Sequence, residues 1–240
     1  MGKSDPFIFQ FYNGNIRPRG EVAQLGSTDN RLFRGELYDR ALNNWEINSD
    51  WNLDSKYDTI ICTRCAYFCK DLTTFFDKAH QYLEDGGTFY VDFGIGDHWR
   101  FEPYKIGWVK DEEQEHAYWD DNYLWSTVWD DRLLEDKAYQ QFCKYVEKKG
   151  YTDVKQAIHD EVPEVMNIKD LEDKFDITYQ TMTLWEDSPQ FNILLKCVKR
   201  DNMSVYIISE LCGQWGGSVR RAEQMILQSK LAGADAVKVH

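Results

Sequence analysis

The sequence lacks the features that mark several large protein classes. Its 240 residues carry 28 Lys and Arg against 41 Asp and Glu, a net charge of −13, so no basic surplus is available for nucleic acid or anionic lipid. No apolar run reaches the roughly 18 residues of a membrane span, and the first residues do not resemble a signal peptide. Six cysteines are too few for a disulfide scaffold. We therefore expect a cytoplasmic protein with reduced thiols that binds neither nucleic acid nor membranes.

The apolar content is sufficient for a folded core, because residues of the AVILMFWYC set make up 42% and aromatic residues 15% of the chain. The composition changes near the C-terminus. Residues 203–240 have a net charge of +1 and two aromatic residues, whereas residues 1–202 have a net charge of −14 and 34 aromatic residues. This shift predicts two domains, 1–202 and 203–240, joined by a charged connector.

The middle of the chain predicts a strand, a helix and a second strand. Residues 57–64 form a short apolar run typical of a strand buried on both faces. Asp71 is placed to cap a helix whose apolar residues recur every three or four positions up to Leu83. Gly86-Gly87 is expected to end that helix, and residues 88–93 are expected to form the next strand. A βαβ unit of this length belongs to a parallel sheet.

Further elements lie on both sides of this unit. We expect a strand at 21–27, a helix near 137–149 and two strands at 175–185 and 191–198 joined as a hairpin by the turn 186–189. The fold class predicted from these patterns is α/β, with a mostly parallel sheet, a C-terminal antiparallel hairpin and an appended C-terminal βαβ fragment.

Residues 20–200 resemble the class I S-adenosylmethionine-dependent methyltransferases, which have a Rossmann-like sheet. The resemblance rests on TyrAspThrIleIle and the following CysAlaTyrPhe, on LeuGluAspGlyGlyThrPheTyrValAsp, and on TrpGluAspSerProGlnPheAsnIleLeuLeu. These segments correspond to the family's fourth strand, the turn into its fifth strand, and its final hairpin. One feature departs from the family: its Gly-x-Gly-x-Gly loop is replaced by LeuGlySerThrAspAsn, which has one glycine.

The resemblance implies S-adenosylmethionine as cofactor and assigns residues to it by position. Gly26 and Ser27 would face its methionine part, and either Glu36 or Asp39 would bind the ribose hydroxyls. Asp50 and Trp51 would flank the adenine, and Arg64 and Cys65 would line the site. The alternative is that Glu36, Asp39 and Asp50 are ordinary surface acids.

The same resemblance places substrate chemistry after the fifth strand, at the carboxyl edge of the sheet. Asp97 and His98 are the candidate catalytic bases there, and Arg100 could hold an anionic group. A surface loop with a hydrogen-bonded histidine is the alternative.

The acidic, aromatic stretch 111–136 is a second candidate for binding the substrate. Trp119 and Trp125 lie within it among ten Asp and Glu. Aromatic faces beside carboxylates suit a sugar ring or an amine, although these aromatics could equally form a small core of their own.

Cys62, Cys65 and Cys69 have a spacing that invites a metal site. However, Cys62 lies in a predicted buried strand, and no second Cys or His pair accompanies it. We therefore predict no metal.

The tail resembles the start of the sialic acid synthase family, which has a (β/α)8 barrel. The resemblance rests on IleIleSerGluLeu, Gly216-Gly217-Ser218 and LeuAlaGlyAlaAspAlaValLys. It would place Glu210 and Lys238 at the family's active site, but about 38 residues cannot close a barrel. We therefore expect a truncated barrel start without synthase activity, which packs on the body or joins two chains in a homodimer.

Together these patterns predict a methyltransferase that acts on a small molecule, with a carbohydrate or amino sugar suggested by the tail. Two alternatives remain. One is a non-catalytic binding module with a methyltransferase-like fold, and the other is the leading domain of a larger sialic acid synthase-like fusion protein.

Overall fold

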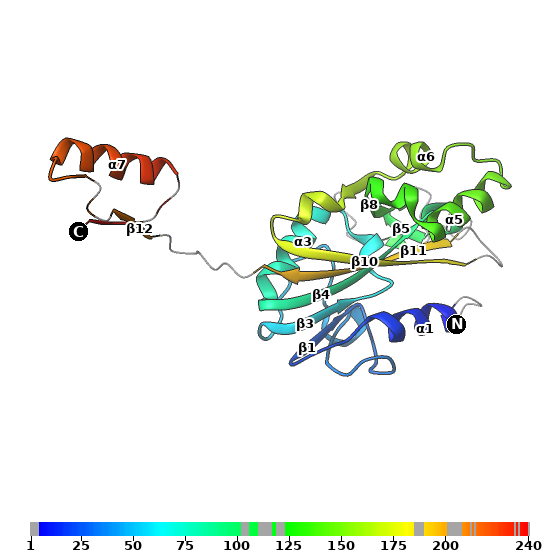
Figure 1. Ribbon diagram of the computed structural model, residues 1–240. Helices are drawn as coiled ribbons and strands as arrows, with labels where there is room; N and C mark the ends of the chain where they lie inside the picture. Colours follow the sequence, from blue (N-terminus) through cyan, green and yellow to red (C-terminus); the bar gives the residue numbers. More distant parts are fainter. Residues whose placement is uncertain are drawn as a thin grey trace. The chain divides into compact units, whose positions relative to one another are not determined.

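The computed structural model describes residues 5–101, 106–109, 117–118, 123–184, 190–200, 208–211, 213, 215–232, 234 and 236–239. The chain divides into two compact units, Met1–Arg200 and Asp201–His240 (Figure 1). The division falls close to the change in composition between residues 202 and 203.

A six-stranded sheet forms the centre of the first unit. Its order is β10-β11-β4-β3-β1-β2. β1 to β4 run parallel, whereas β11 is antiparallel to both β4 and β10. The predicted fold class is thus confirmed, including the antiparallel hairpin. The strands span β1 Val22–Leu25, β2 Glu36–Tyr38, β3 Tyr57–Cys62, β4 Leu83–Ile95, β10 Phe175–Leu184 and β11 Gln190–Lys199.

Helices and smaller strands surround this sheet. The α-helices of the first unit are α1 Asp5–Asn15, α2 Arg40–Asn43, α3 Leu72–Tyr82, α4 Asp97–Phe101, α5 Lys137–Glu147 and α6 Val154–Glu161. The 3-10 helices are η1 Ala66–Phe68, η3 Asp131–Glu135 and η4 Ile168–Leu171. A three-stranded sheet contains β5 Ile106–Val109, β6 Ala117–Tyr118 and β7 Tyr123–Leu124, and a parallel pair contains β8 Ser126–Trp129 and β9 Glu164–Asn167.

The helix α3 forms as its sequence predicts, but it ends earlier. The Asp71 side chain accepts a hydrogen bond from the Thr74 N–H at 2.9 Å, which caps the helix. The predicted stop at Gly86-Gly87 is wrong, because β4 already begins at Leu83, which pairs with Tyr57. The two glycines instead lie in an irregular part of this strand pair, where Gly86 has a φ of +71°.

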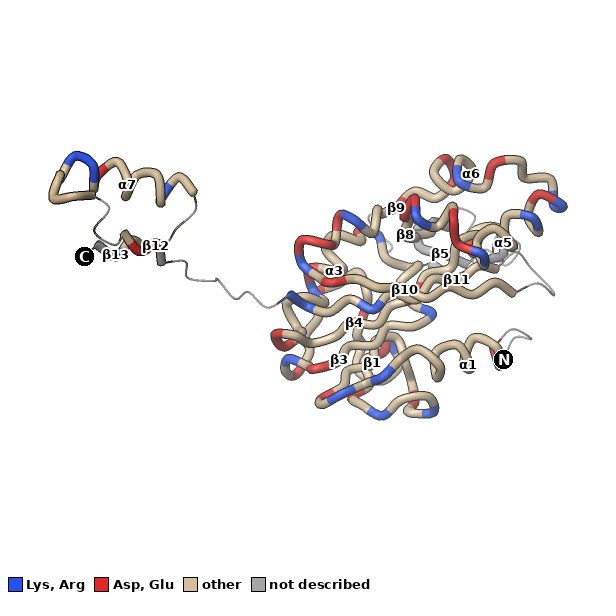
Figure 2. The backbone as a smooth tube through the Cα atoms, in the orientation of Figure 1, with Lys and Arg blue, Asp and Glu red and all other residues tan. Residues whose placement is uncertain are grey.

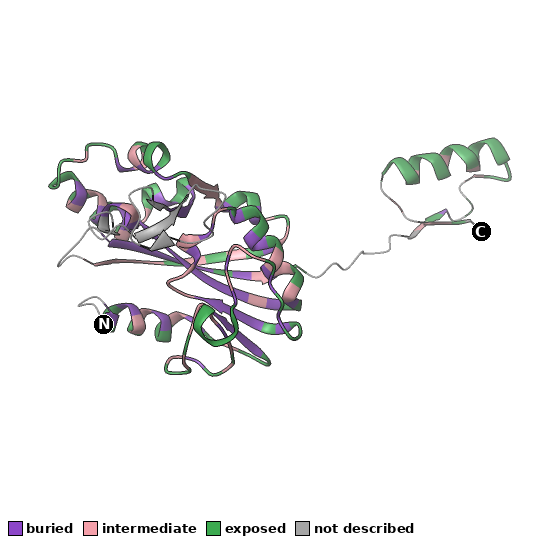
Figure 3. Cartoon of the chain, turned by 180° about the vertical axis from the view of Figure 1, so that it is seen from behind, coloured by how far each residue is buried: buried purple, intermediate pink, exposed green. Residues whose placement is uncertain are grey.

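The two faces of the sheet are covered differently. Alternate β4 residues Phe89, Val91, Phe93 and Ile95 belong to the larger core, which also contains residues of α3 and α5. The opposite face carries a smaller core, in which Ile8 and Tyr12 of α1 pack with Tyr90 and Leu194. In Figure 1, α1 lies below β4, on the side away from α5 and α6. In the view from behind, the central strands are almost continuously buried (Figure 3).

The second unit is a small βαβ element. β12 Ile208–Leu211 and β13 Ala236–Val239 pair in parallel, and α7 Val219–Leu231 connects them. Ser218 caps α7 by accepting a hydrogen bond from the Arg221 N–H. Glu210 pairs with Lys238 in the strand register, and their side chains form an ion pair at 3.2 Å. The secondary structure predicted for the tail is therefore present, while its family assignment and its role in a homodimer remain predictions.

Candidate functional site

The order of the strands identifies one edge of the sheet as a place for a ligand. The chain places β2 on one side of β1 and then crosses over, so that β3 lies on the other side of β1. In open α/β sheets, ligands bind beyond the carboxyl ends of the strands at such a reversal. Here the residues at that point are Gly26, which follows β1, and Thr63 to Cys65, which follow β3.

Gly26 is fixed tightly between the two strand ends. Its φ is +69°, and its N–H donates a hydrogen bond of 2.7 Å to the Tyr38 carbonyl. A Cβ added to it would lie 2.6 Å from Cys65 Sγ. The glycine therefore serves the close approach of Cys65 as well as its left-handed conformation. The neighbouring Ser27 hydroxyl donates to the Asp29 carbonyl at 3.0 Å.

The two candidate ribose acids occupy different places. Asp39 follows β2 directly at the carboxyl edge, and its Oδ1 accepts the Ala41 N–H at 2.8 Å. Glu36 opens β2 and pairs with Ala23, so it lies two residues before that edge. Its Oε2 accepts hydrogen bonds from the hydroxyls of Tyr57 and Tyr38. Asp39 is therefore the acid available to a ligand at the carboxyl edge.

The predicted adenine-binding pair does not form an adenine site. Trp51 is only 2% exposed and packs edge-on against Phe75, with ring centroids 5.5 Å apart. Its Nε1 donates to the Ile47 carbonyl at 3.2 Å. Asp50 is exposed on the preceding turn. Trp51 is thus a core residue, because its ring is covered by the protein itself.

Arg64 connects the end of β3 to two other elements. It has a φ of +58°, and its N–H donates to Asp92 Oδ1 at 2.6 Å. Its guanidinium binds the Asp5 carboxylate at 2.6 Å, at the start of α1. Arg64 thereby fixes both β4 and α1 at the carboxyl edge of the sheet.

Asp92 is a buried carboxyl group in β4. It is 3% exposed and accepts a second hydrogen bond, of 2.5 Å, from the Tyr12 hydroxyl of α1. Burial raises the pKa of Asp92 to about 6, and the charge of Asp97 also raises it, although the hydrogen bonds from Tyr12 and Arg64 act in the opposite direction. The group therefore changes its charge near neutral pH.

The two candidate bases face different surroundings. Asp97 is 3% exposed, and its carboxylate fills the space over Gly94, where an added Cβ would lie 1.8 Å from Oδ2. His98 instead contacts Glu161 at the end of α6, with Nε2 and Oε2 3.2 Å apart. Burial lowers the pKa of His98 to about 4, against the effect of Glu161. The structure thus brings Asp97, but not His98, to the sheet beside Asp92.

The three predicted substrate residues form no common surface among the described residues. Arg100 lies in α4, but its side chain is not among the described ones. Trp119 lies outside the described residues. Trp125 is 3% exposed and packs on Tyr67, with ring centroids 4.8 Å apart. Its face is therefore covered by the protein's own aromatic residues, as expected if the aromatic residues of this stretch form a small core of their own.

The cysteines near the site are free thiols in the described part of the chain. A hydrogen bond with Cys65 raises the pKa of Cys62, and burial raises it further. Burial also raises the pKa of Cys69 to about 12. Within the residues that the structure describes, no group of three or more His, Cys, Asp or Glu is placed to hold a metal ion.

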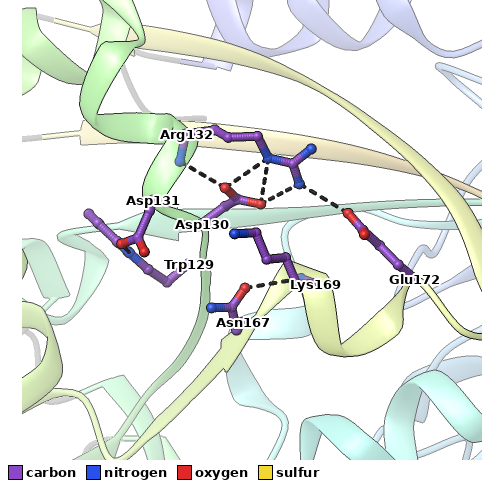
Figure 4. Close-up of polar contacts among 7 residues, drawn as sticks. All are labelled: Trp129, Asp130, Asp131, Arg132, Asn167, Lys169 and Glu172. Carbon is purple, nitrogen blue, oxygen red and sulfur yellow. Dashed lines mark hydrogen bonds and ion pairs between the residues drawn. The ribbon is translucent and has the colours of Figure 1, made fainter.

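A separate polar cluster follows the carboxyl ends of β8 and β9 (Figure 4). Asp130 is fully buried, and its two oxygens accept hydrogen bonds of 2.8 Å from Arg132 Nε. Arg132 also reaches Glu172 at 3.2 Å. Asn167 caps η4 by accepting the Lys169 N–H at 3.0 Å. Because these groups satisfy one another and cap two helices, we assign the cluster a structural role.

Sequence patterns did not identify Tyr12, Asp5 or Asp92. Asp92 lies within an apolar strand. An acidic residue at such a position indicates a functional or structural role, because a buried carboxyl group needs specific partners. The α1 helix carries no charged residue apart from Asp5, and Figure 2 shows it almost free of charge.

The described residues contain no helix long and apolar enough to span a bilayer.

No family model matches the sequence, and no curated protein matches it. Several solved structures resemble it weakly. One is an S-adenosylmethionine-dependent methyltransferase from Thermotoga maritima, described as a possible histamine N-methyltransferase, with 11% identity, 81% of this chain and 90% of that chain covered, and a TM-score of 0.36.

Two others were solved with S-adenosylhomocysteine. The plantazolicin methyltransferase, also bound to a triazolic desmethylPZN analogue, has 12% identity, coverage of 82% and 84%, and a TM-score of 0.37. The magnesium protoporphyrin IX methyltransferase of Synechocystis has 13% identity, coverage of 82% and 82%, and a TM-score of 0.36.

Proposed function

We propose that the first unit is an S-adenosylmethionine-dependent methyltransferase that acts on a small molecule. One observation carries the proposal. The strand order reverses at β1, and the carboxyl groups of Asp39, Asp92 and Asp97 lie at the same carboxyl edge of the sheet as this reversal. The resemblance of residues 20–200 to the methyltransferase family supports it.

The residues at this edge fit the nucleoside part of the cofactor. Asp39 uses Oδ1 to cap α2, and its Oδ2 has no partner within the described part of the chain, so this oxygen is available to a ribose hydroxyl. Gly26 and Ser27 would face the methionine part, and Arg64 and Cys65 would line the site. Bound S-adenosylmethionine would supply a methyl group on a sulfonium.

The chain's own residues would position the methyl acceptor and remove its proton. Asp97, held over Gly94, is the candidate base, and Asp92 lies on the same face of the sheet. The Arg64 guanidinium, which is paired with Asp5, lowers the pKa of Asp92 by its positive charge, and the Arg64 backbone N–H donates to the Asp92 carboxylate. His98 has no part in this proposal, because its ring contacts Glu161.

Calorimetric titration of the full chain with S-adenosylhomocysteine tests the proposal. We expect micromolar binding, weakened at least tenfold by Asp39→Asn, which removes the charge but retains a residue suited to capping. Glu36→Gln is the matched control, because Glu36 is bound to two tyrosines away from the edge, and it should leave the affinity unchanged. No heat at millimolar ligand, with a folded protein, would refute the proposal.

One observation favours a non-catalytic binding module instead. Cys65 Sγ fills the space beside Gly26, where a glycine loop would usually admit the cofactor. A chain that binds no S-adenosylhomocysteine before or after Cys65→Ala would support this second candidate. A sugar acceptor, and a role as the leading domain of a synthase-like fusion, rest only on the resemblance of the tail.

A further inference from the structure

Four polar side chains share the α1 face of the sheet near the carboxyl end of β4. They are Asp92 of β4, Asp97 of α4, and Gln190 and Asn192 of β11, and each is 3% exposed. On the opposite face, the same stretch of β4 and β11 contains only apolar residues, namely Val91, Phe93, Ile95, Phe191 and Ile193. The difference between the two faces requires an explanation beyond packing, since burying polar groups costs free energy.

The strand register places Asn192 beside Asp97. Asn192 pairs directly with Gly94, so its side chain lies on the face to which a Gly94 side chain would point. The Asp97 carboxylate occupies that space, with Oδ2 1.8 Å from the ideal Cβ position. Directly opposed Cβ positions are about 5 Å apart. A single small polar group is therefore enough to contact both side chains.

Asn192 has an unused donor. Its Nδ2 is fully buried and has no hydrogen-bond partner in the part of the chain that the structure describes. By contrast, both Asp92 oxygens already accept hydrogen bonds, from Tyr12 and from the Arg64 N–H. Leaving a buried donor without a partner costs free energy. This cost is removed if a ligand supplies the missing acceptor.

The charges around Asn192 limit which ligand can do so. An anion would be repelled by the carboxyl groups of Asp92 and Asp97. An ammonium group has no lone pair to accept the Asn192 N–H. A hydroxyl group has both a lone pair for Asn192 and a proton for Asp97.

We propose that Asn192 and Asp97 together bind a neutral hydroxyl group of the substrate, with Asn192 donating to its oxygen and Asp97 accepting its proton in a hydrogen bond. The assignment of this hydroxyl as the methyl acceptor rests on the proposed function. Asn192 is then a residue that binds substrate, and the substrate class is an alcohol or a phenol.

Titration of the full chain with small probes tests this inference. The signal is the NMR resonances of the Asn192 side-chain amide. Phenol and catechol are the hydroxyl probes, and toluene and benzylamine are controls of similar size. We expect both hydroxyl probes to shift the Asn192 amide resonances, and both controls to leave them in place. The resonances are assigned by their loss in Asn192→Leu, and that variant should bind phenol at least tenfold more weakly.

The outcomes separate this inference from the proposed function. Equal shifts with toluene or benzylamine, or no shift with either hydroxyl probe, would overturn the hydroxyl site, even if S-adenosylhomocysteine binds. Shifts specific to the hydroxyl probes in a chain that does not bind S-adenosylhomocysteine would keep the hydroxyl site and refute the methyltransferase. If Asn192→Leu does not fold, triple-resonance assignment of the unmodified chain identifies the Asn192 amide resonances, and the comparison of probes on that chain still decides.

Discussion

Tyr12 of the first helix donates a hydrogen bond to the buried carboxyl group of Asp92, 80 residues later in the chain. The contact connects α1 to β4 and supplies one of the two hydrogen bonds that Asp92 accepts. It also marks the boundary between the smaller core, which contains Tyr12, and the buried polar side chains near the carboxyl end of β4.

Replacing Tyr12 by Phe should therefore destabilise the protein. The change removes the donor but keeps the ring, so the expected loss in free energy of unfolding is about 1–3 kcal/mol. Urea denaturation measures it. Tyr90→Phe is the matched control in the same core, because the Tyr90 hydroxyl makes only a long contact of 3.5 Å with the Arg17 carbonyl. Equal losses in the two variants would contradict a special role for the Tyr12–Asp92 bond.

The pKa of Asp92 predicts how its contribution changes with pH. Because its pKa rises from 3.8 in the unfolded chain to about 6 in the folded one, folding is favoured by protonation. The favourable contribution is complete below pH 3.8 and is lost as the pH rises through 6. Asp92→Asn should therefore gain stability relative to the unmodified chain between pH 4 and 7, by about 3 kcal/mol at most. A difference that stays constant over this range would show that Asp92 does not titrate there.

His98 should show the opposite dependence. Its pKa falls from 6.5 to about 4 on folding, so its contribution is present above pH 6.5 and is lost as the pH falls through 4. His98→Gln should lose less stability than the unmodified chain when the pH is lowered from 6.5 to 4. Chemical denaturation at several pH values measures this difference, and parallel curves for the two proteins would exclude a contribution from His98.

Gly26→Ala should lower the free energy of unfolding for two reasons. The residue has a φ of +69°, and its new Cβ would lie 2.6 Å from Cys65 Sγ. The expected loss is about 1–3 kcal/mol. Adding Cys65→Ala should recover part of it by removing the sulfur, but not the part due to φ. Gly14→Ala in α1 is the control, because nothing lies within 4 Å of the added Cβ, and it should be neutral or stabilising.

The chain contains two Asp-x-Arg pairs that test the value of burial. Arg132→Met leaves the fully buried Asp130 without its main partner, and should cost about 1–3 kcal/mol. Arg31→Met breaks the same pairing with Asp29, but there the arginine side chain is 73% exposed, so no measurable change is expected. Thermal unfolding of both variants makes the comparison. Similar shifts would mean that the Asp130 contact is worth no more than a surface pair.

The strongest sequence patterns predicted much of the fold. The helix α3, the buried strands β3 and β4 and the hairpin of β10 and β11 were all recognisable. The helix has apolar residues at every third or fourth position, the buried strands are short apolar runs, and the hairpin has a clear turn between its strands. The helix α1 was not predicted, since its aromatic residues and single charge lack a distinct polar face. β2 was also missed, because three residues give no period at all.

The site was less predictable, since it depends on which strands become neighbours. Asp97 was identified from its place after β4, but its separation from His98 follows from the turn of α4, which no spacing reveals. The pairing of Asn192 with Gly94 joins residues almost a hundred positions apart. A pattern within one segment contains no information about such a pair.

The packing of α1 against a distant part of the first unit has a consequence for the order of folding. Its partners in the smaller core extend to Leu194 of β11, so α1 completes its contacts only after the hairpin has joined the sheet. Contacts between segments so far apart in sequence must close a long loop and form slowly. During refolding, the amides of α1 should therefore become protected from hydrogen exchange later than those of β3, α3 and β4.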